Sequence, residues 1–436
     1  MLKFKQIGII TVLILINTVH AGEINPSYEV GVWQGFRSAA VTFTFDDGCA
    51  NQFTVAIPLF DQHGFKLTLY PVINWSGGIW SKLQSAAANG HEVGSHTVTH
   101  PDLSGLSEAE QITELQNSQN EINSRISGQR CITIAYPYCN AGKTSICKQY
   151  YIAARGCSGQ IEPKTPSNFM NISSIVCGTE GSVKTANDFF NKAKSAANSK
   201  GWVVFLIHGI DNDGGWSPVT TENLTGAVDS LSAYPDKFWV SSFANVARYI
   251  QERNNVSITE TAVTDSSITF QVSDTLDNGI YNIPLTIRRV LPEGWSSAEI
   301  SQNSEKINSK IVEIGTTKYL MFNVIPDEGD IILVKNVANA IQLKDEELPT
   351  TPYLKQNYPN PFNPKTTIAY SISQKSFVTL RVYNLFGQEV VTLVNEDKIP
   401  GEYTVEFDGS YLPSGTYFYK ICAGDFSSTK KLILLK

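Results

Sequence analysis

The stretch of sequence that decides the fold reads AVTFTFDDG and covers residues 40–48, with a strand expected at residues 40–45. Its first six residues are apolar or β-branched, which is typical of a strand buried within a sheet. Two adjacent carboxylates, Asp46 and Asp47, end the strand, and Gly48 supplies a turn.

Similar short runs recur up to about residue 254, and helical stretches separate them. We expect further strands at residues 66–72, 91–95, 131–136, 150–154, 203–208 and 238–240. Helical spacing is found at residues 51–63, 79–89, 108–126, 186–199 and 222–233. This alternation predicts an α/β sheet or barrel with parallel strands and crossover helices, in which chemistry lies at the C-terminal strand ends.

Three histidines fall at such strand ends. His96 and His100 follow the strand at 91–95, where Pro101 stops the segment from continuing as a helix, and His208 ends a later strand. Two imidazoles and one carboxylate of the Asp46-Asp47 pair can hold a divalent metal with an open coordination position, and the other carboxylate can take a proton from water. Each motif alone is weak, because HxxxH pairs often lie on surfaces and Asp-Asp-Gly is often a turn. Together, in this order, they indicate a metal-dependent site.

The composition limits the function further. The chain has 436 residues, of which 42% are hydrophobic and 17% charged, so about two to four globular domains are expected. Its net charge of −7, without a cluster of five basic residues, argues against nucleic acid as a partner.

The N-terminus predicts export. An apolar segment at residues 7–16 follows Lys3 and Lys5, is too short to span a bilayer, and leads to small residues before Gly22. We expect a secretory signal peptide at residues 1–21 and no transmembrane anchor in the mature chain, the alternative being an uncleaved N-terminal anchor.

Export makes disulfides plausible among the six cysteines of the first half. The spacing alone fixes no pairing. Short loops favour Cys139 with Cys147 and Cys157 with Cys177, which leaves Cys49 with Cys131.

After residue 254 the apolar period changes to two, which predicts all-β structure. A sandwich-like β domain is expected at residues 255–343, a charged, Pro-bearing linker at 344–353, and a second β module at 354–436. The middle domain carries no chemical motif and is interpreted as a spacer or a glycan-binding module.

The first half resembles the polysaccharide deacetylases of carbohydrate esterase family four, which share the NodB-like homology domain. The resemblance covers about residues 39–253 and is carried by TFDDG at 44–48, HTVTH at 96–100, YPY at 136–138 and LIH at 206–208. It implies a distorted (β/α) barrel at residues 26–254 and a set of site residues with distinct roles. These are Asp46 as general base, Asp47, His96 and His100 as metal ligands, His208 as general acid, and the backbone N–H of Tyr138 in the oxyanion hole.

Two features depart from the family pattern. The family often places an arginine two residues before the proline of its third motif, where this chain has Ala135. Arg155 is the candidate replacement, against the alternative of an exposed surface arginine. The aspartate that supports the catalytic histidine is not recognisable either; Asp211 and Asp213 are candidates, although a loop turn explains them more simply.

Three tryptophans, Trp75, Trp80 and Trp216, are candidates for stacking on sugar rings, against ordinary burial.

The last module resembles the type A sorting domain of the type IX secretion system. The matching stretches are QNYPNPFNP at 356–364, YNLFG at 383–387, LPSGTY at 412–417 and KKLIL at 430–434. The resemblance implies the type IX machinery as a partner and export across the outer membrane of a Gram-negative cell, followed by release or surface attachment. The alternative is an adhesive or carbohydrate-binding module.

These motifs and resemblances together predict a secreted, metal-dependent polysaccharide deacetylase that acts on an acetylated glycan. N-acetyl removal from chitin-like or peptidoglycan-like chains is favoured, with an O-acetyl, xylan-type esterase or an inactive surface glycan-binding protein as alternatives. Zn²⁺ is the expected ion, and Co²⁺, Ni²⁺ or Mn²⁺ would also suit the nitrogen and oxygen ligands.

Overall fold

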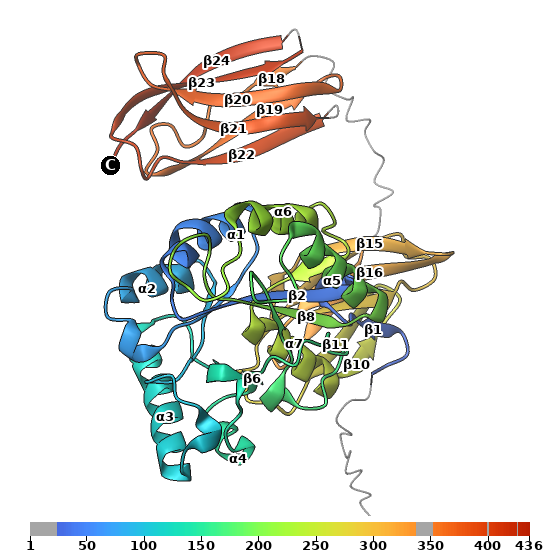
Figure 1. Ribbon diagram of the computed structural model, residues 1–436. Coiled ribbons are helices and arrows are strands. Elements are labelled where there is room, and N and C mark those ends of the chain that lie inside the picture. Colours follow the sequence, from blue (N-terminus) through green and yellow to red (C-terminus); the bar gives the residue numbers. More distant parts are fainter. Residues whose placement is uncertain (1–23, 337–351, 399–400, 425) are drawn as a thin grey trace, which may run out of the picture. The chain divides into compact units, whose positions relative to one another are not determined.

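The computed structural model describes residues 24–336, 352–398, 401–424 and 426–436 (Figure 1). These residues belong to two compact units, which divide after residue 336. The expected signal peptide and most of the expected linker lie outside the described residues. Within the described ranges, no helix is both long enough and apolar enough to cross a bilayer.

The first unit contains a parallel sheet built around the buried strand β2 (Ala39–Asp46). Strand β8 (Trp202–Ile207) pairs along one side of β2, and β3 (Thr68–Tyr70) pairs with its C-terminal end. Strand β9 (Phe238–Val240) pairs with the start of β2. Beyond these lie β4 (Glu92–Val93), next to β3, and β7 (Ile175–Val176), next to β8.

Two more parallel strands close this sheet into an irregular ring. Strands β5 (Thr133–Ala135) and β6 (Ala153–Arg155) pair with each other. A parallel bridge joins Ser95, just after β4, to Ile134, and another joins Arg155 to Ile172, just before β7. The expected distorted (β/α) barrel is therefore confirmed.

Helices follow most strands, and side-chain caps define where several of them begin. Ser107 and Glu110 form a reciprocal capping box at the start of α3, as Thr185 and Asp188 do at the start of α5. The helices of the barrel are η2 (Gln52–Ala56), α1 (Ile57–Gln62), α2 (Trp80–Ala88), α3 (Glu108–Arg125), α4 (Thr144–Cys147), α5 (Ala186–Ser199), α6 (Thr221–Ser232) and α7 (Phe243–Asn255). Short 3-10 turns lie at η1 (Gln34–Phe36), η3 (Ile73–Trp75), η4 (Leu103–Gly105), η5 (Pro137–Cys139) and η6 (Phe169–Asn171). Helices α4 and α7 were not expected from the sequence.

The middle domain consists of two antiparallel sheets that share one hydrophobic cluster. One sheet has the order β10 (Ser257–Val263), β11 (Ser267–Ser273), β17 (Ile331–Lys335), β13 (Ala298–Gln302), β14 (Glu305–Lys306). The other has the order β1 (Tyr28–Val30), β12 (Leu285–Val290), β16 (Thr317–Val324), β15 (Ser309–Ile314). The rings of Phe270 and Phe322, one from each sheet, are 5.9 Å apart.

The barrel and the middle domain are less separate than the sequence analysis expected. Strand β1 precedes the barrel in sequence, yet it pairs with β12 of the middle domain. The Tyr249 hydroxyl on α7 donates a hydrogen bond of 2.9 Å to the carbonyl oxygen of Gly31, next to β1. Buried residues of β2, β8 and α7 belong to the same hydrophobic cluster as those of the middle domain. The boundary expected at residue 26 therefore assigns a strand of the middle domain to the barrel.

The second unit is an all-β module of two antiparallel sheets with a shared core. One sheet has the order β18 (Tyr353–Leu354), β19 (Lys365–Ile372), β22 (Gly401–Asp408). The other has the order β21 (Glu389–Lys398), β20 (Ser376–Tyr383), β23 (Gly415–Ala423), β24 (Phe426–Leu434). The alternating residues Ile368, Tyr370 and Ile372 are buried, as their period of two predicts.

Candidate active site

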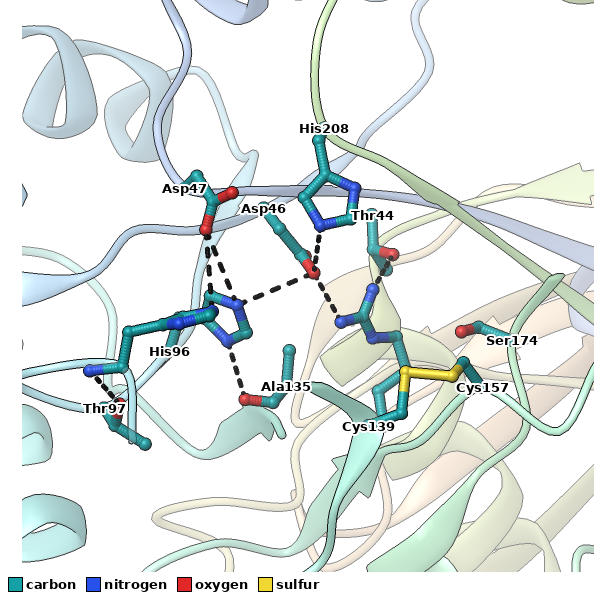
Figure 2. A network of polar contacts seen from close by, with 12 residues as sticks. Thr44, Asp46, Asp47, His96, Thr97, Ala135, Cys139, Cys157, Ser174 and His208 are labelled. Carbon is teal, nitrogen blue, oxygen red and sulfur yellow. Dashed lines mark hydrogen bonds and ion pairs between the residues drawn. A yellow bond between two sulfur atoms is a disulfide. The ribbon is translucent and has the colours of Figure 1, made fainter. Parts of the chain in front are cut away.

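The end of β2 separates two adjacent carboxylates. Asp46 is its last residue, and Asp47 and Gly48 then adopt positive φ angles of 69° and 74°. The Asp47 N–H donates a hydrogen bond of 3.1 Å to the carbonyl oxygen of Tyr70, the last residue of β3. This turn points the two carboxylates in different directions (Figure 2).

Asp47, His96 and His100 converge on one point. The Nε2 atoms of His96 and His100 lie 3.7 and 4.0 Å from Asp47 Oδ1, and the three ligand atoms lie within 4.8 Å of one another. These distances exceed hydrogen bonds but suit an ion placed between the atoms at about 2.0–2.2 Å from each. Asp47 Oδ1 is buried without a hydrogen-bond partner among the described residues. The donor set therefore fits a divalent cation.

The His96 ring is held in one orientation and is neutral. His96 Nδ1 lies 2.8 Å from the carbonyl oxygen of Ala135, which orients Nε2 toward Asp47 (Figure 2). Burial lowers the pKa of His96 to about 4, so the imidazole is in the form that binds metals. Burial, together with the neighbouring Asp46, raises the pKa of Asp47 to about 7; a bound cation would reverse this shift.

Arg155 lies against Asp46, so the alternative of an exposed surface arginine is wrong. The Arg155 side chain is 1% exposed, and its Nη2 donates a hydrogen bond of 2.6 Å to Asp46 Oδ2. Its Nη1 donates to Thr44 Oγ1 at 3.1 Å. Burial by itself would raise the pKa of Asp46, but Arg155, with His96 and His208, holds this pKa below its usual value.

His208 lies across the site from the metal ligands, without a supporting aspartate. Its Nε2 is 3.8 Å from Asp46 Oδ2, and its buried Nδ1 has no hydrogen-bond partner in the described part of the chain. Asp211 instead accepts hydrogen bonds from Thr221, and Asp213 accepts from the backbone N–H groups of Asn51 and Gly215. The explanation of Asp211 and Asp213 as loop residues is therefore the correct one.

Tyr138 lies in a strained turn after β5. Tyr138 and Cys139 have consecutive positive φ angles of 55° and 62°. The Tyr138 side chain is exposed and its ring lies 4.7 Å from that of His100. Its backbone N–H has no acceptor among the described residues, so it is available to a ligand.

The disulfide pairing expected from short loops is wrong. Cys139 pairs with Cys157, while the other four candidates are free cysteines: Cys49, Cys131, Cys147 and Cys177. Cys139 follows β5 and Cys157 follows β6, and because these strands are parallel neighbours their ends lie side by side. Cys147 is instead buried on α4, where its sulfur accepts a hydrogen bond from the Tyr136 hydroxyl.

Sequence reasoning missed Gln52, which links the two sides of the site. This buried side chain begins a short π-helix, and its Nε2 donates to the carbonyl oxygens of Asp46 (2.5 Å) and His208 (2.9 Å). Single π-turns are frequent at functional sites, but a glutamine in a helical stretch gives no sequence signal.

The two carboxylates and the three histidines line a pocket of about 470 Å³, together with Tyr138 and Arg155. Trp216, 52% exposed, also lines it, and its ring lies 4.9 Å from that of His208. Trp75, 54% exposed, lies 5.1 Å from the ring of His100. Trp80 does not join them, because it packs under the guanidinium of Arg125.

Two parts of the chain are similar to known protein families. The family model for polysaccharide deacetylases matches residues 34–152, and that for secretion-system C-terminal sorting domains matches residues 356–435. Gellan lyase from a Bacillus species is 32% identical over 337 residues, which cover 72% of this chain and 14% of that protein. Chitin deacetylase from Colletotrichum lindemuthianum is 30% identical over 122 residues, which cover 26% of this chain and 47% of that protein.

Among solved structures, the Xyl-CE4 domain of a multidomain xylanase from the hindgut metagenome of Trinervitermes trinervoides is 16% identical, with a TM-score of 0.37. The match covers 50% of this chain and 94% of that one. The chain spans less than half the length of the two curated relatives. The first family match includes the Asp-Asp pair, both histidine ligands and Tyr138. The chain thus contains a segment that matches the polysaccharide deacetylase family and a C-terminal segment that matches secretion-system sorting domains.

Proposed function

We propose that this protein is a secreted, metal-dependent deacetylase that removes acetyl groups from a glycan outside the cell. One observation carries the proposal: Asp47, His96 and His100 converge on a metal position, while Asp46 lies beside them, kept ionised by Arg155. A metal ligand set next to a separate ionised base can activate water for hydrolysis of an amide or ester.

The three ligands would hold a divalent cation, with Zn²⁺ the first choice for two imidazoles and a carboxylate. When bound, the cation would polarise the acetyl carbonyl and make a water molecule easier to deprotonate. The Ala135 carbonyl keeps the His96 ring in its ligating orientation throughout.

The remaining groups move protons and stabilise charge. Asp46 accepts the proton of the attacking water, and its Oδ1, which has no hydrogen-bond partner in the described structure, is the oxygen available for this. The Tyr138 N–H donates to the oxygen that becomes negative, a contact that can lower a barrier by about 3–4 kcal/mol in a water-poor site. His208 Nε2 protonates the departing nitrogen or oxygen.

The surroundings of the pocket favour a sugar polymer over a small metabolite. Trp75 and Trp216 expose about half of their surfaces beside His100 and His208. Exposed aromatic rings at a pocket suit stacking on sugar faces. We favour N-acetyl removal because a curated relative is a chitin deacetylase. An O-acetyl esterase of the xylan type would use the same groups.

Two observations favour an inactive glycan-binding protein as the second candidate. Among the described residues, no carboxylate supports His208 at Nδ1, and the family's third-motif arginine is replaced by Ala135. Arg155 offsets the second departure, because it holds Asp46 from a different strand.

Acetate release tests the proposal. The mature protein would be loaded with Zn²⁺, and a parallel sample would be treated with a chelator. Both samples would be incubated with acetylated chitooligosaccharide, peptidoglycan, acetylated xylan and gellan. Release that the chelator abolishes and Zn²⁺ restores would support the deacetylase. Bound zinc with glycan binding but no acetate release would favour the inactive protein, and acetate release that a chelator leaves unchanged would contradict the metal role.

Export is tested separately. The sorting domain indicates secretion, and we propose the type IX route to the outside or the outer surface of a Gram-negative cell. A chain that ends at residue 353 should remain inside a host with this machinery, and its appearance outside would contradict the proposal.

A further inference from the structure

The disulfide between Cys139 and Cys157 lies in the wall of the active-site pocket. We infer that it is a positioning element, which holds the Tyr138 amide and the Arg155 guanidinium in place, so that turnover depends on its being oxidised. The inference rests on the proposed deacetylase function.

On one side, the disulfide anchors the turn that carries Tyr138. The last backbone hydrogen bond between strands β5 and β6 is donated by the Tyr136 N–H to the carbonyl oxygen of Arg155, at 3.1 Å. Past this bond the chain takes two consecutive positive φ angles at Tyr138 and Cys139. Residues with a side chain adopt this conformation only where their surroundings impose it. The disulfide continues the β5–β6 pairing covalently through this turn.

On the other side, the disulfide fixes the segment that carries Arg155. Gly156 N–H donates a hydrogen bond of 2.8 Å to the carbonyl oxygen of Ile172, and a Cβ at Gly156 would lie 2.3 Å from Asn171 Oδ1. Gly156 is therefore tightly packed against the segment that leads to β7. The next residue, Cys157, is joined by the disulfide to the turn that carries Tyr138. Figure 2 shows this disulfide on the same side of the site as Thr44, the second partner of Arg155.

Reduction would release both supports at once. A water-soluble phosphine converts the disulfide and one water molecule into two thiols and a phosphine oxide, which is a two-electron reduction. The turn that carries the Tyr138 amide would then lose its covalent anchor, and the Arg155 contact to Asp46 would loosen. The substrate-stacking tryptophans belong to other segments and would keep their places, so catalysis should fall more than binding.

The test compares the oxidised and reduced forms of the full mature protein in its zinc form. Reduction should lower kcat about tenfold or more, since oxyanion donors are worth about 10²–10³ in rate, while KM changes less than about twofold. Oxidised glutathione should restore the rate. The Cys139→Ser/Cys157→Ser variant should have the low kcat without any response to phosphine. A Cys422→Ser variant, which changes a free cysteine of the second unit, should respond like the unmodified protein.

The possible results separate the two proposals. If the oxidised protein releases acetate and the reduced protein keeps its kcat, the positioning role is wrong and the deacetylase stands. If reduction abolishes the circular dichroism signal of the fold, the disulfide supports the whole unit and the positioning role is again wrong.

If even the oxidised protein releases no acetate, the deacetylase proposal fails, and hydrogen–deuterium exchange decides the positioning role. Reduction should then raise exchange at residues 137–140 and 155–157 and leave β2 and β8 unchanged. Equal exchange of the two forms would overturn the inference.

Discussion

Replacing Arg155 with methionine tests the electrostatics around Asp46. The two side chains are 1% and 2% exposed, and their ion pair of 2.6 Å is the shortest contact that the Asp46 carboxylate makes. Removing one partner of a buried pair leaves an uncompensated charge, which costs about 3–5 kcal/mol of unfolding free energy. We expect a loss of this size for Arg155→Met at neutral pH.

The loss should depend on pH in a defined direction. The pKa of Asp46 in the folded protein lies below its usual value, so the ion pair stabilises the fold above that usual pKa. This stabilisation disappears as the pH falls through the folded pKa. In Arg155→Met, burial is no longer opposed by the guanidinium, so the pKa of Asp46 rises and the carboxyl is protonated on folding. The difference between the two proteins should therefore shrink toward acid pH.

Urea unfolding of the metal-free protein measures this effect. The double variant Asp46→Asn/Arg155→Met removes the buried charge as well and should recover at least about half of the lost stability. Arg125→Met is the matched control, because Arg125 pairs with Glu121 on the surface and should contribute less than about 1 kcal/mol. A loss below about 1 kcal/mol for Arg155→Met, or no recovery in the double variant, would refute the reasoning.

Three further changes test other parts of the structure. Asp46→Asn should keep the zinc site but lower turnover by about 10²–10⁴-fold, measured as bound zinc and acetate release; an active variant would contradict its role as base. Gln52→Met should lower the free energy of unfolding in urea by about 1–3 kcal/mol, because the carbonyls of Asp46 and His208 lose their shared donor. The same variant should have a lower kcat and a smaller change in KM. A polypeptide that ends at residue 254 lacks the partner of β1 and should show no cooperative thermal transition by circular dichroism, whereas one that ends at residue 336 should; a cooperative transition in the shorter chain would argue for an independent barrel.

The local pattern of apolar residues in the sequence predicts the strands that are buried on both faces of the sheet. Strand β9 has the predicted bounds, and β2 and β8 differ from theirs by one residue at each end. Their continuous apolar runs can form little else. Strand β1 has three residues and no distinctive pattern, and its partner lies in another domain, so only the fold could reveal it.

The site likewise contains some residues that the local sequence pattern predicts and others that it does not. The convergence of the Asp-Asp pair with His96 and His100 could be predicted, because each motif ends a strand and parallel strands end at one face. Arg155 was a candidate only because β6 was expected to end near it. The disulfide was not predicted correctly, since proximity in sequence is a poor guide when neighbouring parallel strands bring residues 18 positions apart together.

The pairing of β1 with β12 also constrains the order in which this chain can fold. Tyr28 lies opposite Arg289, 261 residues later in the chain. During synthesis or passage through a secretion pore, the first strand has no partner until the segment around residue 290 has emerged. Contacts this distant in sequence form slowly, because a long loop must close before they contribute. The N-terminal strand thus delays completion of the first unit until nearly all of that unit is available.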